Sequence, residues 1–165
     1  MIPILSMKQA LELDKYTIES GYLSKKELMD NAGKKIAQFI MEVIDDSFNK
    51  QFVILAGPGN NGGDGIICHH YLIDYGAQSE LLLIDENQKD SWIFNEYSFN
   101  TDSIQIYSKS YKFSPNNLYV DGIFGIGLKR DLKSKYEKII LKIIDMPNVI
   151  SIDIPSGIYS DTGMA

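Results

Sequence analysis

The sequence contains few of the residues that build common functional sites. It has one cysteine, two histidines, one tryptophan and a single arginine among 16 basic residues. The lone cysteine, Cys68, excludes an internal disulfide and a cysteine-built zinc site, and it favours a reducing compartment. His69 and His70 follow directly, and consecutive helical residues project about 100° apart, so the three cannot face one metal. We interpret all three as ordinary helix residues.

The chain also lacks a basic surplus and an N-terminal signal pattern. Its formal net charge is −6, from 22 acidic and 16 basic residues, which disfavours broad electrostatic binding to nucleic acid or to an anionic membrane. No charged segment followed by an apolar one opens the sequence. We therefore expect a cytoplasmic protein without a membrane anchor. With 165 residues and 44% hydrophobic content, the chain is sized for one domain over residues 1–165.

Hydrophobic periodicity predicts alternating helices and strands. Helical spacing is present from residue 7 to 18, and a Ser24/Glu27 capping box opens a second helix that runs to about Ile44. Further helices are expected at 65–75, around Trp92 and at 131–145, and strands at 52–56, 80–84, 103–107, 118–124 and 149–154. Because crossover helices cover both faces of a parallel sheet, this order predicts an α/β fold. We expect a Rossmann-like three-layer sandwich with a mostly parallel sheet.

The densest motif is Gly-Pro-Gly-Asn-Asn-Gly-Gly-Asp-Gly at residues 57–65, between a predicted strand and a predicted helix. Glycine leaves no side chain in the way, so main-chain N–H groups of such a turn can approach a ligand. Gly57, Gly59 and Gly62 match the dinucleotide fingerprint Gly-x-Gly-x-x-Gly, and Asp85 ends the next strand. That match indicates an NAD-dependent oxidoreductase. Asp64 argues against it, because a carboxylate near the helix start repels a pyrophosphate.

Three aspartates occupy comparable places. Asp121 and Asp153 lie near the carboxyl ends of predicted strands, and Asp64 lies beside the glycine-rich turn. Since these strand ends line the ligand crevice of an open α/β sheet, we expect the three to face one cavity. Carboxylates that close require a bound cation or a raised pKa. The oxygens of Asn61, Asp121 and Ser156 favour a hard cation.

The single arginine, Arg130, follows the Asp121 strand beside glycines 125 and 127. A planar bidentate donor at a glycine-rich loop suits a phosphate. The alternative is a solvated residue that opens the next, lysine-rich helix. Both interpretations remain open from the residues alone.

Four ordered motifs together resemble the YjeF N-terminal domain family, the NAD(P)H-hydrate epimerases. They are the glycine-rich turn, Asp-Gly-Ile-Phe-Gly-Ile-Gly-Leu at 121–128, Ser-Ile-Asp-Ile-Pro-Ser-Gly at 151–157, and the Asp-Thr-Gly that begins at Asp161. Leu-Met-Asp-Asn-Ala-Gly at 28–33 resembles the family's opening helix signature. The likeness runs from about residue 7 to residue 163.

The resemblance implies a repair enzyme that interconverts the R and S epimers of hydrated NADH and NADPH by acid–base catalysis. It implies a potassium ion held by Asn61, Asp121 and Ser156, with Asp153 as the catalytic group. It further implies that the hydrated dinucleotide is bound by Asn60, Asn61, Gly62, Gly63, Asp64, Gly125, Ile126, Gly127, Leu128, Lys129, Arg130, Asp131 and Asp153. A separate NAD(P)H-hydrate dehydratase is the expected downstream partner.

Two alternatives to an epimerase are kept. One is the NAD-dependent oxidoreductase, although no Tyr-Lys pair or histidine stands out as its catalytic group. The other is a non-catalytic dimeric module that binds a nucleotide or RNA in the same pocket; the acidic net charge and the three candidate ion ligands weigh against it. The apolar N-terminal helix offers a surface for a homodimer. Because the family usually continues past Gly163, we expect a domain that lacks the last C-terminal elements.

Overall fold

The computed structural model describes residues 5–128, 132 and 134–164. Its centre is a five-stranded sheet in the order β3-β2-β1-β4-β5, in which every strand pair is parallel. The strands are β1 (Gln51–Ala56), β2 (Gln78–Leu83), β3 (Ile104–Ile106), β4 (Leu118–Gly122) and β5 (Val149–Ser151). Chain order reverses at β1, because β2 lies on one side of it and β4 on the other.

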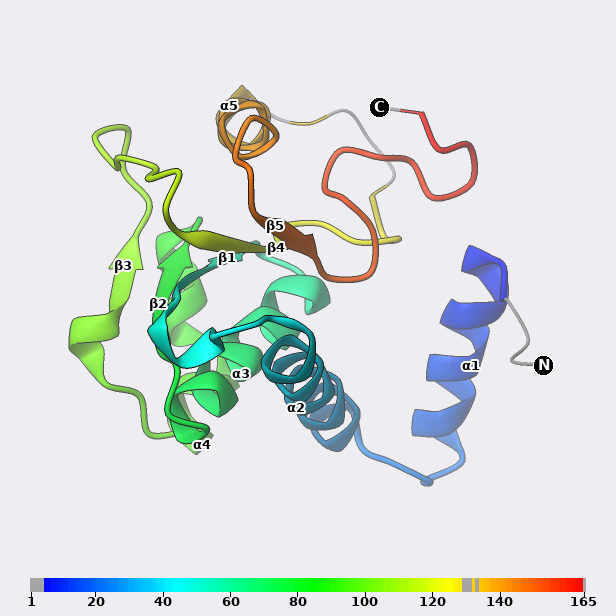
Figure 1. Cartoon of the computed structure of the whole chain (residues 1–165). Helices are drawn as coiled ribbons and strands as arrows, with labels where there is room; N and C mark the ends of the chain where they lie inside the picture. Colours follow the sequence, from blue (N-terminus) through cyan, green and yellow to red (C-terminus); the bar gives the residue numbers. More distant parts are fainter. Residues whose placement is uncertain (1–4, 129–131, 133, 165) are drawn as a thin grey trace.

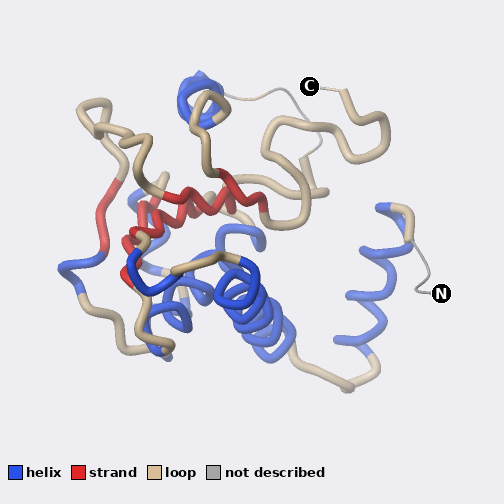
Figure 2. Tube along the Cα trace, in the orientation of Figure 1, coloured by secondary structure: helices blue, strands red, loops and turns tan. Residues whose placement is uncertain are grey.

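Helices cover both faces of this sheet, as predicted (Figures 1 and 2). One face carries three of them and the opposite face carries α5. The helices are α1 (Met7–Glu19), α2 (Lys25–Val43), α3 (Asn60–Asp74), α4 (Trp92–Glu96) and α5 (Ser134–Ile143), and short 3-10 turns lie at Ser47–Asn49, Glu86–Asp90 and Thr101–Ser103. The α/β three-layer prediction is confirmed.

The core is divided into two halves by the alternation of side chains along β1. Phe52 and Ile54 pack toward α2, α3 and α4, whereas Val53 and Leu55 pack toward Ile139 and Ile143 of α5. All four β1 side chains are fully buried. Because β1 is covered on both faces, its sequence is a continuous apolar run rather than an alternating one.

The N-terminal helices begin at capping boxes. Ser24 and Glu27 form the predicted box of α2, and Ser6 with Gln9 forms a second box that starts α1. No residue of α1 is buried, and Figure 1 shows this helix standing apart from the sheet. Among the described residues, none of the helices has the length and apolarity that crossing a membrane requires.

Several element boundaries differ from the predictions. Helix α3 begins at Asn60 and not at residue 65, because the residues after Gly59 already take helical geometry. Strand β5 ends at Ser151, and soon after it Asp153 adopts a left-handed φ of 67°, which ends the extended chain. Strand β4 likewise stops at Gly122, and α5 is shorter at its C-terminal end than predicted.

Candidate active site at the carboxyl ends of the strands

A cavity of about 820 Å³ lies at the carboxyl ends of β1, β4 and β5; we call it the β4-side cavity. Its walls are the glycine-rich turn with the start of α3, the loop at residues 123–128, and Ile152 and Asp153 after β5. Helices α1 and α2 close its outer side with Ala10, Leu11, Asp14, Ala32 and Ile36. This is the switch point of the sheet, where open α/β folds bind ligands.

Asp153 is held in an unusual conformation beside this cavity. Its φ of 67° is rare for a residue other than glycine, asparagine or aspartate. The Ile126 N–H donates a hydrogen bond to Asp153 Oδ2 at 2.7 Å, which joins the loop after β4 to the loop after β5. A Cβ at Gly125 would lie 2.5 Å from the same oxygen, so a larger residue there would displace the Asp153 carboxylate. The structure therefore fixes Asp153 against two other predicted binding residues.

Asp64 faces the same cavity from α3. It lies in the second turn of the helix, since α3 begins at Asn60. Burial, and then the negative charges of Asp14 and Asp153, raise the pKa of Asp64 to about 7. The predicted raised carboxyl pKa is thus found at Asp64, and near neutral pH both its protonated and its ionised forms are populated.

From the raised pKa of Asp64 we predict how the free energy of unfolding depends on pH. In the unfolded chain Asp64 loses its proton near pH 4, and in the folded chain near pH 7, so folded stability falls as pH rises across this window. Asp64→Asn cannot undergo this loss. We expect the variant to be as stable as the parent at pH 4 and about 1–2 kcal/mol more stable at pH 8, after allowance for solvent screening. Urea unfolding at both pH values in potassium-free buffer measures it; equal differences at the two pH values would contradict it.

Asp121 lies at the end of β4 and is 2% exposed. Its carboxylate accepts hydrogen bonds from the Ser156 hydroxyl at 2.6 Å, the Ser156 N–H at 2.8 Å, the Ile123 N–H at 3.1 Å and the Ser151 hydroxyl at 3.4 Å. Burial raises the pKa of Asp121, although these hydrogen bonds oppose the shift. All these donors are neutral, and within the described part of the chain no cationic side chain forms a salt bridge with Asp121.

These contacts bring two of the three predicted ion ligands together directly. Asn61 is connected to Asp121 through Ile152. Its side-chain amide donates a hydrogen bond to the Ile152 carbonyl at 3.4 Å, and the Ile152 N–H donates one to the Asp121 main-chain carbonyl at 2.9 Å. The donor set is therefore oxygen-rich, and the described groups that donate hydrogen bonds to the buried Asp121 carboxylate are all neutral. Such a set fits a hard cation of low charge.

The expectation that Asp64, Asp121 and Asp153 face one cavity is wrong for Asp121. Asp121 lines a different hollow, of about 730 Å³, whose walls include Ile140 and Ile143 of α5. The reason is strand parity: Asp121 and Tyr119 point to the same face of β4, and Tyr119 packs in the half of the core that contains α5. Asp64 belongs to α3, which packs on the other face of the sheet.

The other predicted binding residues divide into three groups. Asn60 and residues 125–128 line the β4-side cavity together with Asn61. Gly62 and Gly63 are buried, and a Cβ there would meet the Gly57 carbonyl oxygen at 1.8 Å or the Met29 sulfur at 2.6 Å, so both serve close packing. Lys129, Arg130 and Asp131 lie outside the described residues, and the predicted phosphate contact of Arg130 stays a prediction.

The histidines and the cysteine of α3 behave as helix residues. His69 is buried, contacts the hydroxyls of Ser79 at 2.8 Å and Ser103 at 3.2 Å, and has a pKa lowered to about 4 by burial. Cys68 is fully buried. Within the ranges that the structure describes, no cluster of three or more His, Cys, Asp or Glu residues is suited to a metal ion.

Two site residues escaped the sequence interpretation. Asp14 reaches the cavity from α1, one helical turn beyond Ala10 and within the helical spacing at residues 7–18 that predicted this helix. That helical spacing could have indicated that Asp14 lies on the same face of the helix as Ala10. Ser151 adds a hydroxyl to Asp121 because the two residues pair directly between β4 and β5, a register that required the strand order.

The motifs gathered around the two strand ends match a known family. The profile described as "YjeF-related protein N-terminus" matches residues 25–165. The chain belongs to this family. The profile spans every element from α2 onward, including the glycine-rich turn, the loop after β4 and the Asp153 segment.

Members of this family with curated names are similar over most of the chain. An NAD(P)H-hydrate epimerase of Paramecium tetraurelia is 33% identical over 95% of this chain and 68% of its own length. A bifunctional NAD(P)H-hydrate repair enzyme of Dictyoglomus turgidum is 38% identical over 82% of this chain. The crystal structure of the yeast protein YNL200c has a TM-score of 0.80 at 22% identity and covers 99% of this chain and 75% of its own, which shows the shared fold.

Some of the matched relatives are much longer than this chain. They span 28% of the Dictyoglomus protein and 30% of a second bifunctional repair enzyme, from Thermofilum pendens, which is 32% identical. The chain therefore corresponds to less than a third of these two proteins.

Proposed function

We propose that this chain is an NAD(P)H-hydrate epimerase, which interconverts the R and S epimers of hydrated NADH and NADPH. The observation that carries the proposal is the β4-side cavity, where the strained Asp153 and the partly protonated Asp64 face one space at the switch point of the sheet. Names of relatives that align over most of the chain support the same substrate class.

The chemistry requires proton movement and no hydride. The hydroxyl-bearing carbon lies beside the ring nitrogen, so loss of hydroxide leaves an iminium, and return of hydroxide to the opposite face inverts the centre. Asp153 donates a proton to the leaving hydroxyl and takes one back when the bond re-forms. Asp64, with a pKa of about 7, offers a second carboxyl that is neutral in part of the molecules at physiological pH. In the alternative route, ring opening, a base takes the hydroxyl proton and an acid gives one to the ring nitrogen as the carbon–nitrogen bond breaks; ring closure on the opposite face reverses both transfers.

A potassium ion belongs to this proposal, with Asn61, Asp121 and Ser156 as its ligands. When bound, the ion would offset the negative charge of the buried Asp121 carboxylate. The residues themselves hold the loops: Ser156 accepts a hydrogen bond from the Phe124 N–H at 2.8 Å, which ties the loop after β4 to the loop after β5. The protein acts on its substrate in the cytoplasm, and a dehydratase consumes the product.

Chiral separation of hydrated NADH tests the activity. Starting from one purified epimer, we expect the protein to restore the equilibrium mixture faster in potassium buffer than in choline buffer. Potassium should also raise the melting temperature in a saturable way, because a ligand that binds only the folded state stabilises it. In Asp121→Asn this potassium-dependent rise should disappear. A rate of epimer exchange equal to that of buffer alone would contradict the proposed function.

A further inference from the structure

A second cavity, of about 520 Å³, lies on the other side of the glycine-rich turn; we call it the β2-side cavity. Its walls include Met29 and Trp92, and Asp85 and Gln88 at the end of β2. It shares Pro58, Gly59 and Asn60 with the β4-side cavity, so the two hollows flank the start of α3. The first N–H groups of a helix have no partner within it, so this shared wall attracts anions.

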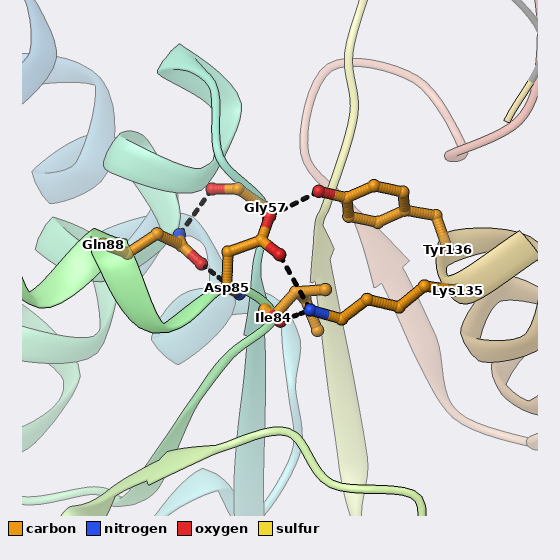
Figure 3. Close-up of polar contacts among 6 residues, drawn as sticks. All are labelled: Gly57, Ile84, Asp85, Gln88, Lys135 and Tyr136. Carbon is orange, nitrogen blue, oxygen red and sulfur yellow. Dashed lines mark hydrogen bonds and ion pairs between the residues drawn. The ribbon is translucent and has the colours of Figure 1, made fainter. Parts of the chain in front are cut away.

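Asp85 is the centre of a polar cluster at the edge of this cavity (Figure 3). The Lys135 ammonium lies 2.7 Å from Asp85 Oδ1 and also donates to the Ile84 carbonyl, and the Tyr136 hydroxyl donates to Oδ2. On the other side, the Asp85 N–H donates to Gln88 Oε1 at 2.9 Å, and Gln88 Nε2 donates to the Gly57 carbonyl at 2.6 Å. The end of β2 is thus tied both to the glycine-rich turn and to α5.

The β4-side cavity, the glycine-rich turn and the β2-side cavity follow one another along the sheet in the order found in dinucleotide-binding folds. There the pyrophosphate crosses the glycine-rich turn, the reactive half lies on the β4 side, and the adenosine ribose lies at the end of β2. An acidic residue at that strand end binds the ribose 2′-hydroxyl and repels the 2′-phosphate of NADP-type ligands. Here Lys135 pairs with that acidic residue, and both side chains keep some solvent exposure. The remaining charges of the cavity wall, Glu86 and Lys25, offset each other.

We propose that the β2-side cavity receives the adenosine half of the dinucleotide, and that Lys135, held against Asp85, is the residue that admits a 2′-phosphate there. The inference rests on the proposed function for the identity of the substrate. Tyr136 and the Gln88 bridge hold Asp85, which lines the cavity, and Asp85 in turn holds the ammonium of Lys135 at the edge of the cavity. The chain then accepts both NADH and NADPH hydrates.

Trp92 gives a direct optical test of the first half of this proposal. It is the only tryptophan of the chain, and it lines the β2-side cavity. We expect AMP and adenosine 2′,5′-bisphosphate to change its fluorescence in a saturable way, because an adenine base in this cavity alters the indole's surroundings. An emission spectrum that neither nucleotide changes at millimolar concentration would overturn the proposal.

Two charge variants test the second half. Lys135→Met removes the ammonium that lies beside the Asp85 carboxylate, so we expect affinity for adenosine 2′,5′-bisphosphate, relative to AMP, to fall about tenfold. Asp85→Asn keeps Lys135 and removes the negative charge, so the same ratio should rise. Lys138→Met, which removes another exposed lysine of α5, is the matched control and should leave the ratio unchanged.

The change in the ratio of the two nucleotide affinities distinguishes a role of the Asp85–Lys135 pair in selectivity from a purely structural role. A purely structural role for the Asp85–Lys135 pair predicts that both variants weaken both nucleotides alike, and that result would refute the proposal. Epimerisation assays with hydrated NADPH and hydrated NADH should follow the same ratio. If the binding ratios shift as expected while the parent protein exchanges no epimers, the proposed function fails and the adenosine site stands.

Discussion

Asp153→Asn is expected to lower the rate of epimerisation about a hundred- to ten-thousandfold, which is the usual contribution of a general acid–base group. The asparagine amide has nearly the same shape and its oxygen can still accept the Ile126 N–H, so the left-handed backbone at this position is retained. It has no proton to donate to a leaving hydroxide and takes none back. Binding of the substrate should therefore survive while turnover is lost.

The measurement is the first-order rate of epimer exchange, with the substrate-induced rise in melting temperature as the readout for binding. Asp145→Asn, an exposed aspartate in the loop after α5, removes one carboxylate elsewhere and serves as control. We expect the control to match the parent in both readouts. Undiminished exchange by Asp153→Asn would move the acid–base role to another group, and Asp64 is the carboxyl that shares the cavity.

The fold was predictable because its signals are local. The Ser24/Glu27 capping box fixes the start of α2, and the apolar run at 52–56 already marks a strand that is covered on both faces. The start of α3 was missed, since glycines disfavour a helix on propensity alone. Close packing overrides that preference here: Gly62 lies against the Gly57 carbonyl, where a larger residue does not fit.

The geometry around the predicted site residues was only partly predictable from the sequence. Asp121 and Ser156 do meet, but the two-residue alternation of β4 turns Asp121 toward α5 and away from Asp64. That parity is readable from the sequence once Tyr119 is recognised as a core residue of the α5 side. The contribution of Lys135 at Asp85 was not readable, because it depends on where α5 packs against the far end of β2, which is a contact across 50 residues.

Gly62→Ala is expected to lower the free energy of unfolding by about 3 kcal/mol, and the melting temperature by roughly 6–12 °C for a chain of this size. A Cβ at this position would lie 1.8 Å from the Gly57 carbonyl oxygen and 2.6 Å from its carbonyl carbon. Both are backbone atoms, so no side-chain rotation relieves the overlap. The start of α3 has to move away from the end of β1.

That movement also disturbs function, because the Gly57 carbonyl holds Gln88 at the β2-side cavity while Asn60 and Asn61 begin the wall of the β4-side cavity. Gly127→Ala is the matched control: it lies in the loop after β4, and among the described residues other than its chain neighbours no atom lies within 4 Å of the place that its methyl group would take. Thermal unfolding followed by circular dichroism compares the two variants. Equal melting temperatures of the two variants would mean that α3 and β1 do not approach each other as closely as the Gly57–Gly62 contact requires. The two cavities would then lack the shared wall that a dinucleotide bridging them needs.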